Sequence, residues 1–127
     1  MKNLRKVSYT NKHTTMEINV DENNNPWLTK TQIAELYGKD RSSISRQVDS
    51  ILKILDKTIL ESKNNPVRAK FAHTENDGKT YKFYHYSSNV LLALDTKLSV
   101  NIGHQLKEYI DNQLSDEILA KNGEVII

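Results

Sequence analysis

Apolar and polar positions alternate near the start of the chain. Residues 15–20 alternate strictly, which predicts a half-buried strand. The Asp- and Asn-rich stretch 21–26 is typical of a turn, and residues 27–28 predict a short second strand. The chain is therefore expected to carry an N-terminal β-hairpin. Residues 1–15, which are polar and basic, are expected to form a flexible arm.

Two helices joined by a tight turn are predicted next. Thr29 is a suitable N-cap, Gln32 three residues later completes a capping box, and Gly38 is expected to end the first helix in the left-handed conformation. Asp40 is expected to cap a second helix over residues 40–55. The predicted buried face of this second helix consists of Ile44, Val48, Ile51, Leu52 and Leu55.

Over residues 67–86 apolar and polar positions again alternate with a period of two, which predicts a second β-hairpin. If its loop places Gly78 in the left-handed conformation, Phe71 faces Phe83 and His73 faces Tyr81. One face of the hairpin is then aromatic. The opposite face is basic and gathers Arg68, Lys70, Lys82 and Tyr84.

Two more helices are predicted towards the C-terminus. Ser87 or Ser88 is expected to cap a short helix over residues 89–94, and a longer helix runs from about residue 100 to 119. The apolar stripe of the longer helix consists of Ile102, Leu106, Tyr109, Ile110, Leu114 and Ile118. This stripe either covers the domain's own core or pairs with its copy in a homodimer. Residues 120–127 are expected to be a frayed tail.

The composition is typical of one soluble globular domain. The chain has 127 residues, 37% hydrophobic and 27% charged, and a mean hydropathy of −0.65. The longest apolar run, residues 90–94, is far shorter than the ~20 residues that span a bilayer. Residues 1–15 lack the apolar segment of a secretory signal, and the absence of cysteine excludes a disulfide framework. We expect a cytoplasmic, nucleoid-associated protein that makes no contact with a membrane.

The net charge of +2 is unevenly distributed. Residues 1–97 carry sixteen basic and eleven acidic side chains, whereas residues 98–127 carry two basic and five acidic ones. A basic body with an acidic end is expected when one surface meets a polyanion and another meets something else.

The first two predicted helices have the spacing of a helix-turn-helix. Ala34 is small where the two helices must cross closely, Gly38 follows four positions later at the turn, and Ile44 comes six positions after that as an anchor. Gln47 stands where many such motifs have an aliphatic residue, and the neighbouring Val48 is expected to supply that anchor.

The second helix of this motif is expected to direct a polar side outward, which carries Arg41, Ser42, Ser45, Arg46 and Asp49. Two of the chain's four arginines lie on it, and a planar guanidinium matches O6 and N7 of guanine. The free N–H groups at the start of the helix suit phosphate. The alternative interpretation is a plain helical hairpin whose exposed face is rich in Ser and Arg.

The hairpin at residues 67–86 follows this helix, at the place where a winged helix carries its wing. Its basic side chains, Lys79 and Lys82 together with Lys70 and Arg68, suit the neutralisation of phosphates. The alternative is a solvated basic face that makes no contact with DNA. The basic arm at residues 2–12 is expected to add phosphate or minor-groove contacts.

No pattern of an enzyme or a metal site is present. The sequence contains no H-E-x-x-H, P-loop, nucleophile elbow or spaced acidic pair. His73 and His85 lie in the hairpin without a carboxylate at ligand spacing, so we expect them to be packed or hydrogen-bonded. Trp27 is expected to anchor the core. We therefore expect no enzymatic activity, no metal and no cofactor.

Two stretches resemble the RhuM family, which is found in bacterial virulence islands, prophages and other mobile elements. Residues 27–46 resemble the family's W-L-T-x-x-Q-I-A-x-L-F-G-x-D-R-S-x-I-S-R-H signature, and residues 69–81 resemble C-A-K-F-A-x-T-x-x-D-G-K-x-Y. The resemblance covers about residues 27–115 of this chain, and it matches the N-terminal module of a family that is usually longer. Near the C-terminus Gly103 fits, but Ile102 replaces a family arginine. Members are described as DNA-binding regulators, which the resemblance implies for this chain.

Together these features predict an α+β fold, a winged helix-turn-helix with an N-terminal β-hairpin, a β-hairpin wing and a C-terminal helix over residues 16–119. The expected function is sequence-specific binding of double-stranded DNA as a transcriptional regulator of a mobile element, prophage or plasmid, as a homodimer through the C-terminal helix. The residues expected to contact DNA are Thr29, Lys30, Lys39, Arg41, Ser42, Ser43, Ser45, Arg46, Lys70, Lys79 and Lys82. The alternative is a protein-interaction module, such as an antirepressor or antitoxin-like partner.

Overall fold

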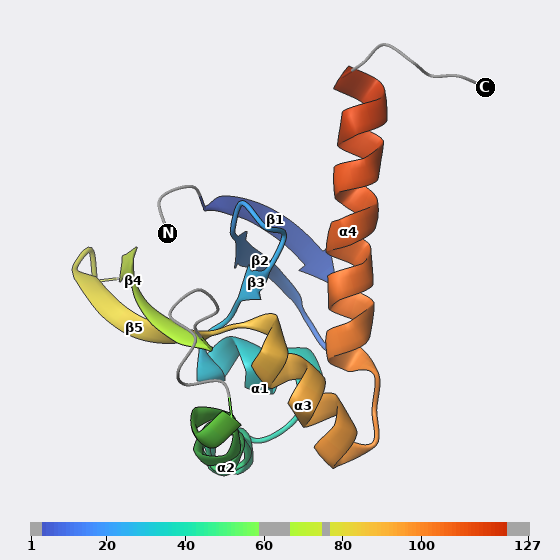
Figure 1. The fold of residues 1–127 in the computed structure, drawn as a ribbon. Coiled ribbons are helices and arrows are strands. Elements are labelled where there is room, and N and C mark those ends of the chain that lie inside the picture. The colour runs from blue at the N-terminus through green and yellow to red at the C-terminus, as the bar shows by residue number, and fades with distance from the viewer. Residues whose placement is uncertain (1–3, 59–66, 75–76, 122–127) are drawn as a thin grey trace.

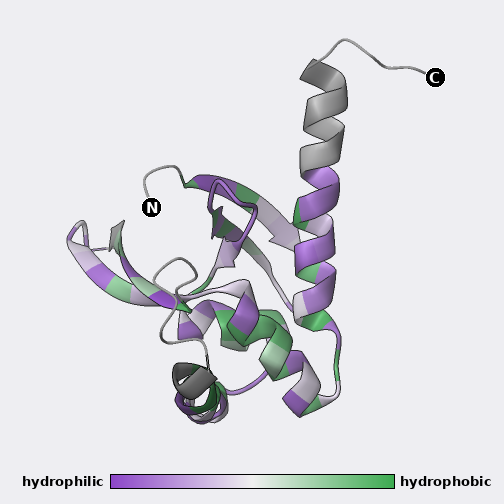
Figure 2. Ribbon diagram, viewed as in Figure 1, coloured by the Kyte–Doolittle hydropathy of each residue, from purple (hydrophilic) through white to green (hydrophobic). Residues whose placement is uncertain are grey.

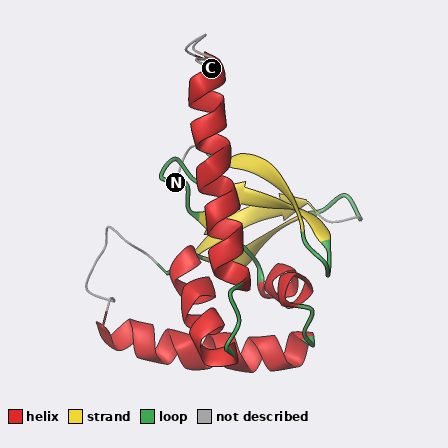
Figure 3. Cartoon of the chain, turned by 90° about the vertical axis from the view of Figure 1, so that its right-hand side faces the viewer, coloured by secondary structure: helices red, strands yellow, loops and turns green. Residues whose placement is uncertain are grey.

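The computed structural model describes residues 4–58, 67–74 and 77–121. Within these ranges the chain forms two small antiparallel sheets and four helices, so the α+β class predicted from the sequence is confirmed. Figure 1 shows the two sheets on one side of the molecule and the last helix, α4, extending past the rest of the chain. In Figure 3 the long helix α2 runs across the base of the molecule, below both sheets.

The first sheet contains β1 (Arg5–Thr10), β2 (Thr15–Val20) and β3 (Pro26–Trp27), in the order β1-β2-β3. The flexible arm predicted for residues 1–15 is therefore wrong, because residues 5–10 pair with β2 along their whole length. Val7 and Tyr9 are buried, whereas Lys6 and Ser8, which alternate with them, are exposed. Two apolar positions among basic residues made this alternation too weak to predict a strand.

The second sheet is a hairpin of β4 (Arg68–Thr74) and β5 (Thr80–Tyr86). Phe71 pairs with Phe83 and His73 with Tyr81, as the sequence predicts, and Gly78 adopts a φ of 80° in the loop. One isolated bridge joins the two sheets. In it the N–H groups of Leu28 and Tyr86 each donate to the other residue's carbonyl oxygen, at 3.1 and 2.7 Å.

The first two helices are α1 (Lys30–Tyr37) and α2 (Arg41–Thr58). The predicted capping box of α1 is present, because the Thr29 hydroxyl accepts from the N–H of Gln32 and the Gln32 side chain accepts from the N–H of Thr29. Gly38 ends α1 with a φ of 63°, as predicted. The loop between β1 and β2 lies against this end, where Nδ2 of Asn11 donates to the carbonyl oxygen of Leu36 at 2.9 Å.

The last two helices are α3 (Ser88–Leu98) and α4 (Ile102–Lys121). The prediction for α3, residues 89–94, was too short, because Asp95 broke the apolar pattern and yet lies buried inside the helix. Ser87 is its N-cap residue, and Ser99 ends it in the left-handed conformation. The predicted tail beyond residue 119 is helical to Lys121, and residues 122–127 lie outside the described part.

The described part of the α4 stripe covers the chain's own core. Leu106 and Ile110 are fully buried, and the Tyr109 ring packs edge-on against Tyr9 with the ring centroids 5.1 Å apart. The Tyr109 hydroxyl also donates to the carbonyl oxygen of Ser8 in β1. The interpretation as a core-covering face is therefore confirmed for this half of the stripe. The side chains of Leu114 and Ile118 lie outside the described residues.

One hydrophobic core joins the helices to the first sheet. Figure 2 shows apolar colouring concentrated on α3 and on the parts of the other elements that surround it. Each fully buried Leu or Ile contributes on the order of 2 kcal/mol by leaving water. The large apolar side chains that lie fully buried are Ile18, Leu28, Ile33, Leu36, Ile44, Leu91, Leu94, Leu106 and Ile110. This core fixes α1 and α2 relative to each other, and thereby the exposed side of α2.

Candidate nucleic-acid interface

The exposed side of α2 carries most of the residues predicted for it. Ile44 and Val48 are buried at 1% and 0% exposure, which turns the opposite side of the helix outward. Ser42 and Arg46 are exposed on that side, and Arg41, the first residue of the helix, is exposed at its N-terminal end. We call these three residues the α2 polar patch. The amphipathic pattern predicted its direction correctly, because the buried positions recur at the helical period.

The turn between α1 and α2 is held by local hydrogen bonds. Asp40 caps α2, since its Oδ2 atom accepts from the backbone N–H of Ser43 at 3.1 Å. Lys39 is exposed in this turn, and Ser43 is half-buried. Ala34 is 5% exposed in the core, as expected for a small residue where the two helices pack closely. These contacts keep the start of α2 next to the turn, with its side chains open to solvent.

Lys30 and Ser45, both predicted to contact DNA, contact each other within the chain. Nζ of Lys30 donates to Oγ of Ser45 at 3.0 Å and forms an ion pair with Oδ1 of Asp49 at 2.8 Å. Ser45 is half-buried at this contact, so it is less exposed than the predicted outward-facing residues Arg41, Ser42 and Arg46. A lysine fifteen residues away in sequence occupies its hydroxyl, and helical periodicity alone does not reveal such a partner. Lys30 therefore binds the start of α1 to the middle of α2.

Two further predicted residues take part in intramolecular contacts at the start of α1. The hydroxyl of Thr29 is used in the capping box. Nε of Arg41 donates to Oγ1 of Thr31 at 3.2 Å, while the side chain stays exposed. No contact within the described residues uses the terminal nitrogens of Arg41. Its guanidinium is thus positioned by one hydrogen bond and keeps the two nitrogens that bidentate recognition requires.

The hairpin carries a second cationic cluster, which we call the hairpin cluster: Arg68, Lys70, Lys82 and Tyr84. Cζ of Arg68 and Nζ of Lys70 each lie 4.8 Å from the centroid of the Tyr84 ring. The Tyr84 ring attracts and orients both side chains, and each such contact contributes about 0.5–1 kcal/mol at an exposed site. Lys79 and Lys82 are exposed towards the loop end of the hairpin.

A groove of about 470 Å³ separates the hairpin from the first sheet. Its walls come from β1 and β2, from the start of α1, from Arg41 at the start of α2, and from β5. The sequence did not predict this groove, because Lys6 was assigned to a flexible arm and Glu17 and Asn19 to a solvent-facing strand surface. Only the pairing of β1 with β2 brings Lys6 next to Asn19. The alternation of polar Lys6 and Ser8 with apolar Val7 and Tyr9 was the one signal in the sequence for strand β1.

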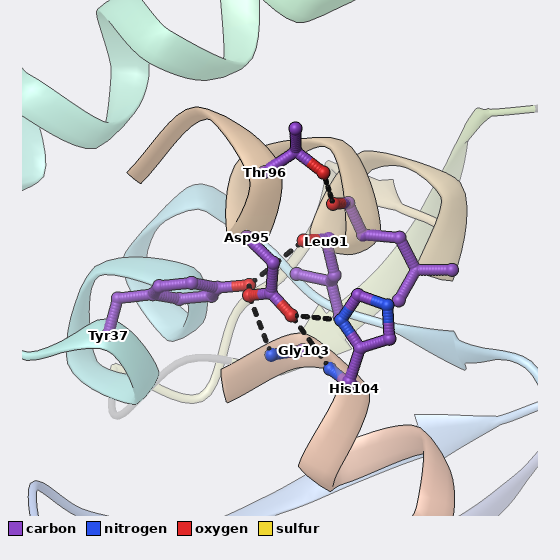
Figure 4. A network of polar contacts seen from close by, with 7 residues as sticks. Tyr37, Leu91, Asp95, Thr96, Gly103 and His104 are labelled. Atoms are coloured by element: carbon purple, nitrogen blue, oxygen red, sulfur yellow. Dashed lines mark hydrogen bonds and ion pairs between the residues drawn. The ribbon is translucent and has the colours of Figure 1, made fainter. Parts of the chain in front are cut away.

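A buried polar network lies away from this interface and holds α3 and α4 together (Figure 4). The Asp95 carboxylate is 1% exposed and accepts from the Tyr37 hydroxyl at 2.7 Å and from the backbone N–H groups of Gly103 and His104, both at 2.9 Å. Nδ1 of His104 donates to the same carboxylate at 2.6 Å. Burial and the neighbouring Asp95 raise the pKa of Tyr37 far above its ordinary value.

Tyr86, which also lines the groove, is a buried tyrosine whose pKa is shifted. Burial raises the pKa of its hydroxyl, while the Lys30 ammonium, 6.0 Å from the ring centroid, lowers it by a smaller amount. Its ring is 4% exposed and so forms part of the support of the groove. His85 is 2% exposed, and its Nδ1 atom lies 3.0 Å from the carbonyl oxygen of Phe83, which confirms the packed role predicted for it.

The described residues contain no group of three or more His, Asp or Glu side chains that is arranged to hold a metal ion. Nor does any helix among them have the length and apolarity needed to cross a membrane. No family model, no curated protein sequence and no solved structure matches the chain. The α2 polar patch and the hairpin cluster are therefore the features of this chain that bear on its function.

Proposed function

We propose that the chain is a sequence-specific, double-stranded DNA-binding regulator with a winged helix-turn-helix, as its resemblance to the RhuM family implies. The observation that carries the proposal is the α2 polar patch. It is a solvent-exposed Arg- and Ser-bearing side on the first two turns of a helix whose other side is fixed in the core. A helix supported in this way is able to enter the major groove of B-form DNA.

The chemistry of the patch suits recognition of base edges. An arginine bonds O6 and N7 of guanine with two parallel hydrogen bonds, and each such pair discriminates against a wrong base by about 1–3 kcal/mol. Arg41 is held at its Nε atom by Thr31, so its terminal nitrogens are directed with less loss of side-chain entropy. Ser42 and Arg46 lie one turn apart on the same side of α2, and Ser42 is able to bond a base or a phosphate.

The hairpin is the proposed wing. It follows α2 in the chain, and the bridge between Leu28 and Tyr86 holds its inner end beside α1. Lys79 and Lys82 are exposed towards its loop end, and Lys70 lies beside them on the strand surface. In the proposed complex these cations neutralise phosphates and position the protein without reading sequence.

A homodimer through α4 completes the proposal. One recognition helix reads few base pairs, and two half-sites one turn of DNA apart multiply the affinity. The extension of α4 beyond the body of the chain is consistent with this role (Figure 1). The expected operator is therefore a palindrome.

The experiment that tests the proposal is the selection of bound duplexes from a random pool by the full chain. We expect a consensus to emerge with guanines at the positions that face Arg41 and Arg46. Enrichment of no sequence over random DNA would contradict the proposal and would favour the protein-interaction alternative.

A further inference from the structure

The groove between the hairpin and the first sheet has a wall that the proposed function does not use. Four consecutive residues of β5, Phe83 to Tyr86, line it. Successive side chains of a strand point to opposite faces, so one face of β5 supplies only every second residue. A wall made of consecutive residues means that the groove runs along the edge of β5. This outer edge is the one that faces away from β4.

The direction of the backbone groups on this edge follows from the pairing. The N–H of Ser87 donates to the carbonyl oxygen of Val67, whereas Tyr86 exchanges its two hydrogen bonds with Leu28 on the other side. Backbone groups alternate in direction along a strand. The N–H and C=O groups of Tyr84 and Lys82 therefore point away from β4, as those of Tyr86 do. Leu28 pairs with Tyr86, the first position of this edge, and no described residue forms a strand pair with Tyr84 or Lys82 there.

We propose that this groove binds an extended acidic peptide segment, which adds to the outer edge of β5 as a strand. The bridge at Leu28 shows that the edge accepts strand pairing. An added strand continues that pairing along Tyr84 and Lys82, over about five residues or ~17 Å. Donors and acceptors alternate on this edge. A peptide backbone satisfies both, whereas a phosphodiester supplies only acceptors and leaves the two carbonyl groups unmatched.

The side chains around the groove determine the charge of the partner. Lys6, Lys30 and Arg41 line it, and Lys82 lies on the open edge beside it. Lys30 is already paired with Asp49, and Glu17 is the acidic residue among those that line the groove. The balance is cationic, so acidic side chains on the partner gain attraction and basic ones meet repulsion. Phe83, at 36% exposure, lies on the opposite face of β5 from Lys82 and offers apolar surface for the residues between the acidic ones.

This inference stands independently of DNA binding, because the edge and the groove do not depend on what α2 contacts. The two are linked by Arg41, which belongs both to the groove and to the α2 polar patch. If both bind, an acidic peptide and DNA compete for this arginine.

The test uses the isotope-labelled full chain and the probe peptide acetyl-(Glu-Val)3-amide, observed by NMR. We expect hydrogen exchange to slow by about tenfold or more at the amides of Lys82 and Tyr84, whose N–H groups gain a partner. Phe83 lies between them with its N–H directed at β4, so its exchange is expected to change much less. This alternation distinguishes strand addition from general electrostatic attraction.

Two matched controls use the peptide itself. Methylating the backbone nitrogens on one edge of the probe is expected to abolish binding, whereas methylating those on the other edge retains it. A peptide with Lys in place of Glu is expected to bind at least about tenfold more weakly, a loss of about 1.4 kcal/mol. Equal binding by both methylated peptides, or by the Lys peptide, would overturn the proposal. So would the same amide protection produced by a single-stranded oligodeoxynucleotide, which would identify nucleic acid as the occupant.

A matched pair of protein variants tests the edge directly. Lys82→Pro removes the outward N–H, and proline is tolerated on an edge strand at such a position. Lys82→Ala removes the same charge and keeps the N–H. We expect Lys82→Pro to bind the probe about tenfold more weakly than Lys82→Ala, with melting temperature and the chemical shifts of the first sheet as folding controls. Equal affinities of two folded variants would contradict strand addition. Because no DNA is present, failure here leaves the proposed DNA binding unaffected.

Discussion

Nζ of Lys30 and Oδ1 of Asp49 lie 2.8 Å apart, and this ion pair joins the first residue of α1 to the exposed side of α2. The Lys30 side chain is 18% exposed and that of Asp49 is 57% exposed, so solvent screens the pair on one side only. The contact joins the two helices, and in the proposed complex with DNA it would keep the Lys30 ammonium away from a phosphate. If the proposal holds, stability and DNA affinity depend on this ion pair in opposite ways.

Replacing Asp49 by alanine is expected to strengthen binding to duplex DNA. The substitution releases Lys30 and removes a negative charge beside the α2 polar patch, so we expect affinity to rise by about two- to fivefold, or 0.5–1 kcal/mol. The free energy of unfolding should fall by less than about 1 kcal/mol. Fluorescence anisotropy at two salt concentrations, together with thermal unfolding, measures both effects.

Asp111→Ala is the matched control for this prediction. Asp111 has a similar exposure, 52%, and pairs with Lys107 at the same distance of 2.8 Å, but it lies on α4. Its removal changes the net charge equally and should leave DNA affinity within about twofold. An equal gain in both variants would show that net charge alone is responsible, and would contradict the position assigned to Lys30.

The proposed wing gives a prediction about salt dependence. If Lys79 and Lys82 each neutralise one phosphate, replacing both by alanine reduces the slope of log K against log salt by about 2. The preference for the selected sequence over random DNA should remain, because these contacts carry no sequence information. Binding isotherms between 50 and 200 mM salt measure the slope. A slope that does not change would exclude the hairpin loop end from the interface.

Alkaline unfolding should depend on Tyr37. Its pKa is raised in the folded protein above the ordinary value of 10.0, so the folded state holds this proton more tightly than the unfolded state. The stability from this group is complete below pH 10 and is lost as the pH rises above it. Tyr37→Phe should lower stability by about 1–3 kcal/mol at pH 7, because Asp95 loses a donor. It should also reduce the loss of stability between pH 9 and 11.

Urea unfolding at several pH values measures this difference. Lysines titrate in the same range in both proteins, so only the difference between wild type and Tyr37→Phe reports on Tyr37. Parallel pH profiles would show that the hydroxyl titrates in the folded protein as it does in the unfolded chain, against the buried geometry of Figure 4.

The same network predicts a large effect at Asp95. Asp95→Asn keeps the shape of the side chain but replaces one acceptor oxygen by a donor, which then faces donors from Tyr37, Gly103 or His104. We expect a loss of about 2–4 kcal/mol in the free energy of unfolding. Thermal unfolding measures this loss, and Asp77→Asn in the exposed hairpin loop is the control. A loss below 1 kcal/mol would mean that the network contributes little to the packing of α3 against α4.

The sequence predicted those parts of the fold that local rules govern. The capping box at Thr29, the left-handed Gly38 and the pairing of Phe71 with Phe83 all follow from short-range spacing, and all are present. The direction of the α2 polar patch follows from the period of its buried residues. The prediction failed where a distant partner decides the structure. β1 forms because Val7 and Tyr9 pack against the rest of the core, including Tyr109 in α4.

In the candidate site, too, local features were predictable from the sequence and contacts with distant residues were not. Exposure of Arg46 was predictable from the amphipathic pattern, and that of Arg41 from its place at the start of the helix. The contacts of Lys30 with Ser45 and Asp49 were not, since they join residues 15 and 19 positions apart across the crossing of two helices. The groove was not predictable either, because it requires the relative placement of two sheets that are joined by a single bridge.

Base reading by the α2 polar patch is tested most directly by the affinity of the Arg41→Ala plus Arg46→Ala variant for the duplex that the wild-type chain selects. Lys97→Ala plus Lys107→Ala removes the same charge elsewhere and serves as the control. If α2 reads bases, the affinity of the Arg41→Ala plus Arg46→Ala variant for the selected duplex falls by at least about tenfold. Its affinity for random DNA falls much less, and its fold is unchanged. Equal losses on both duplexes, or no loss on the selected one, would contradict base reading by α2.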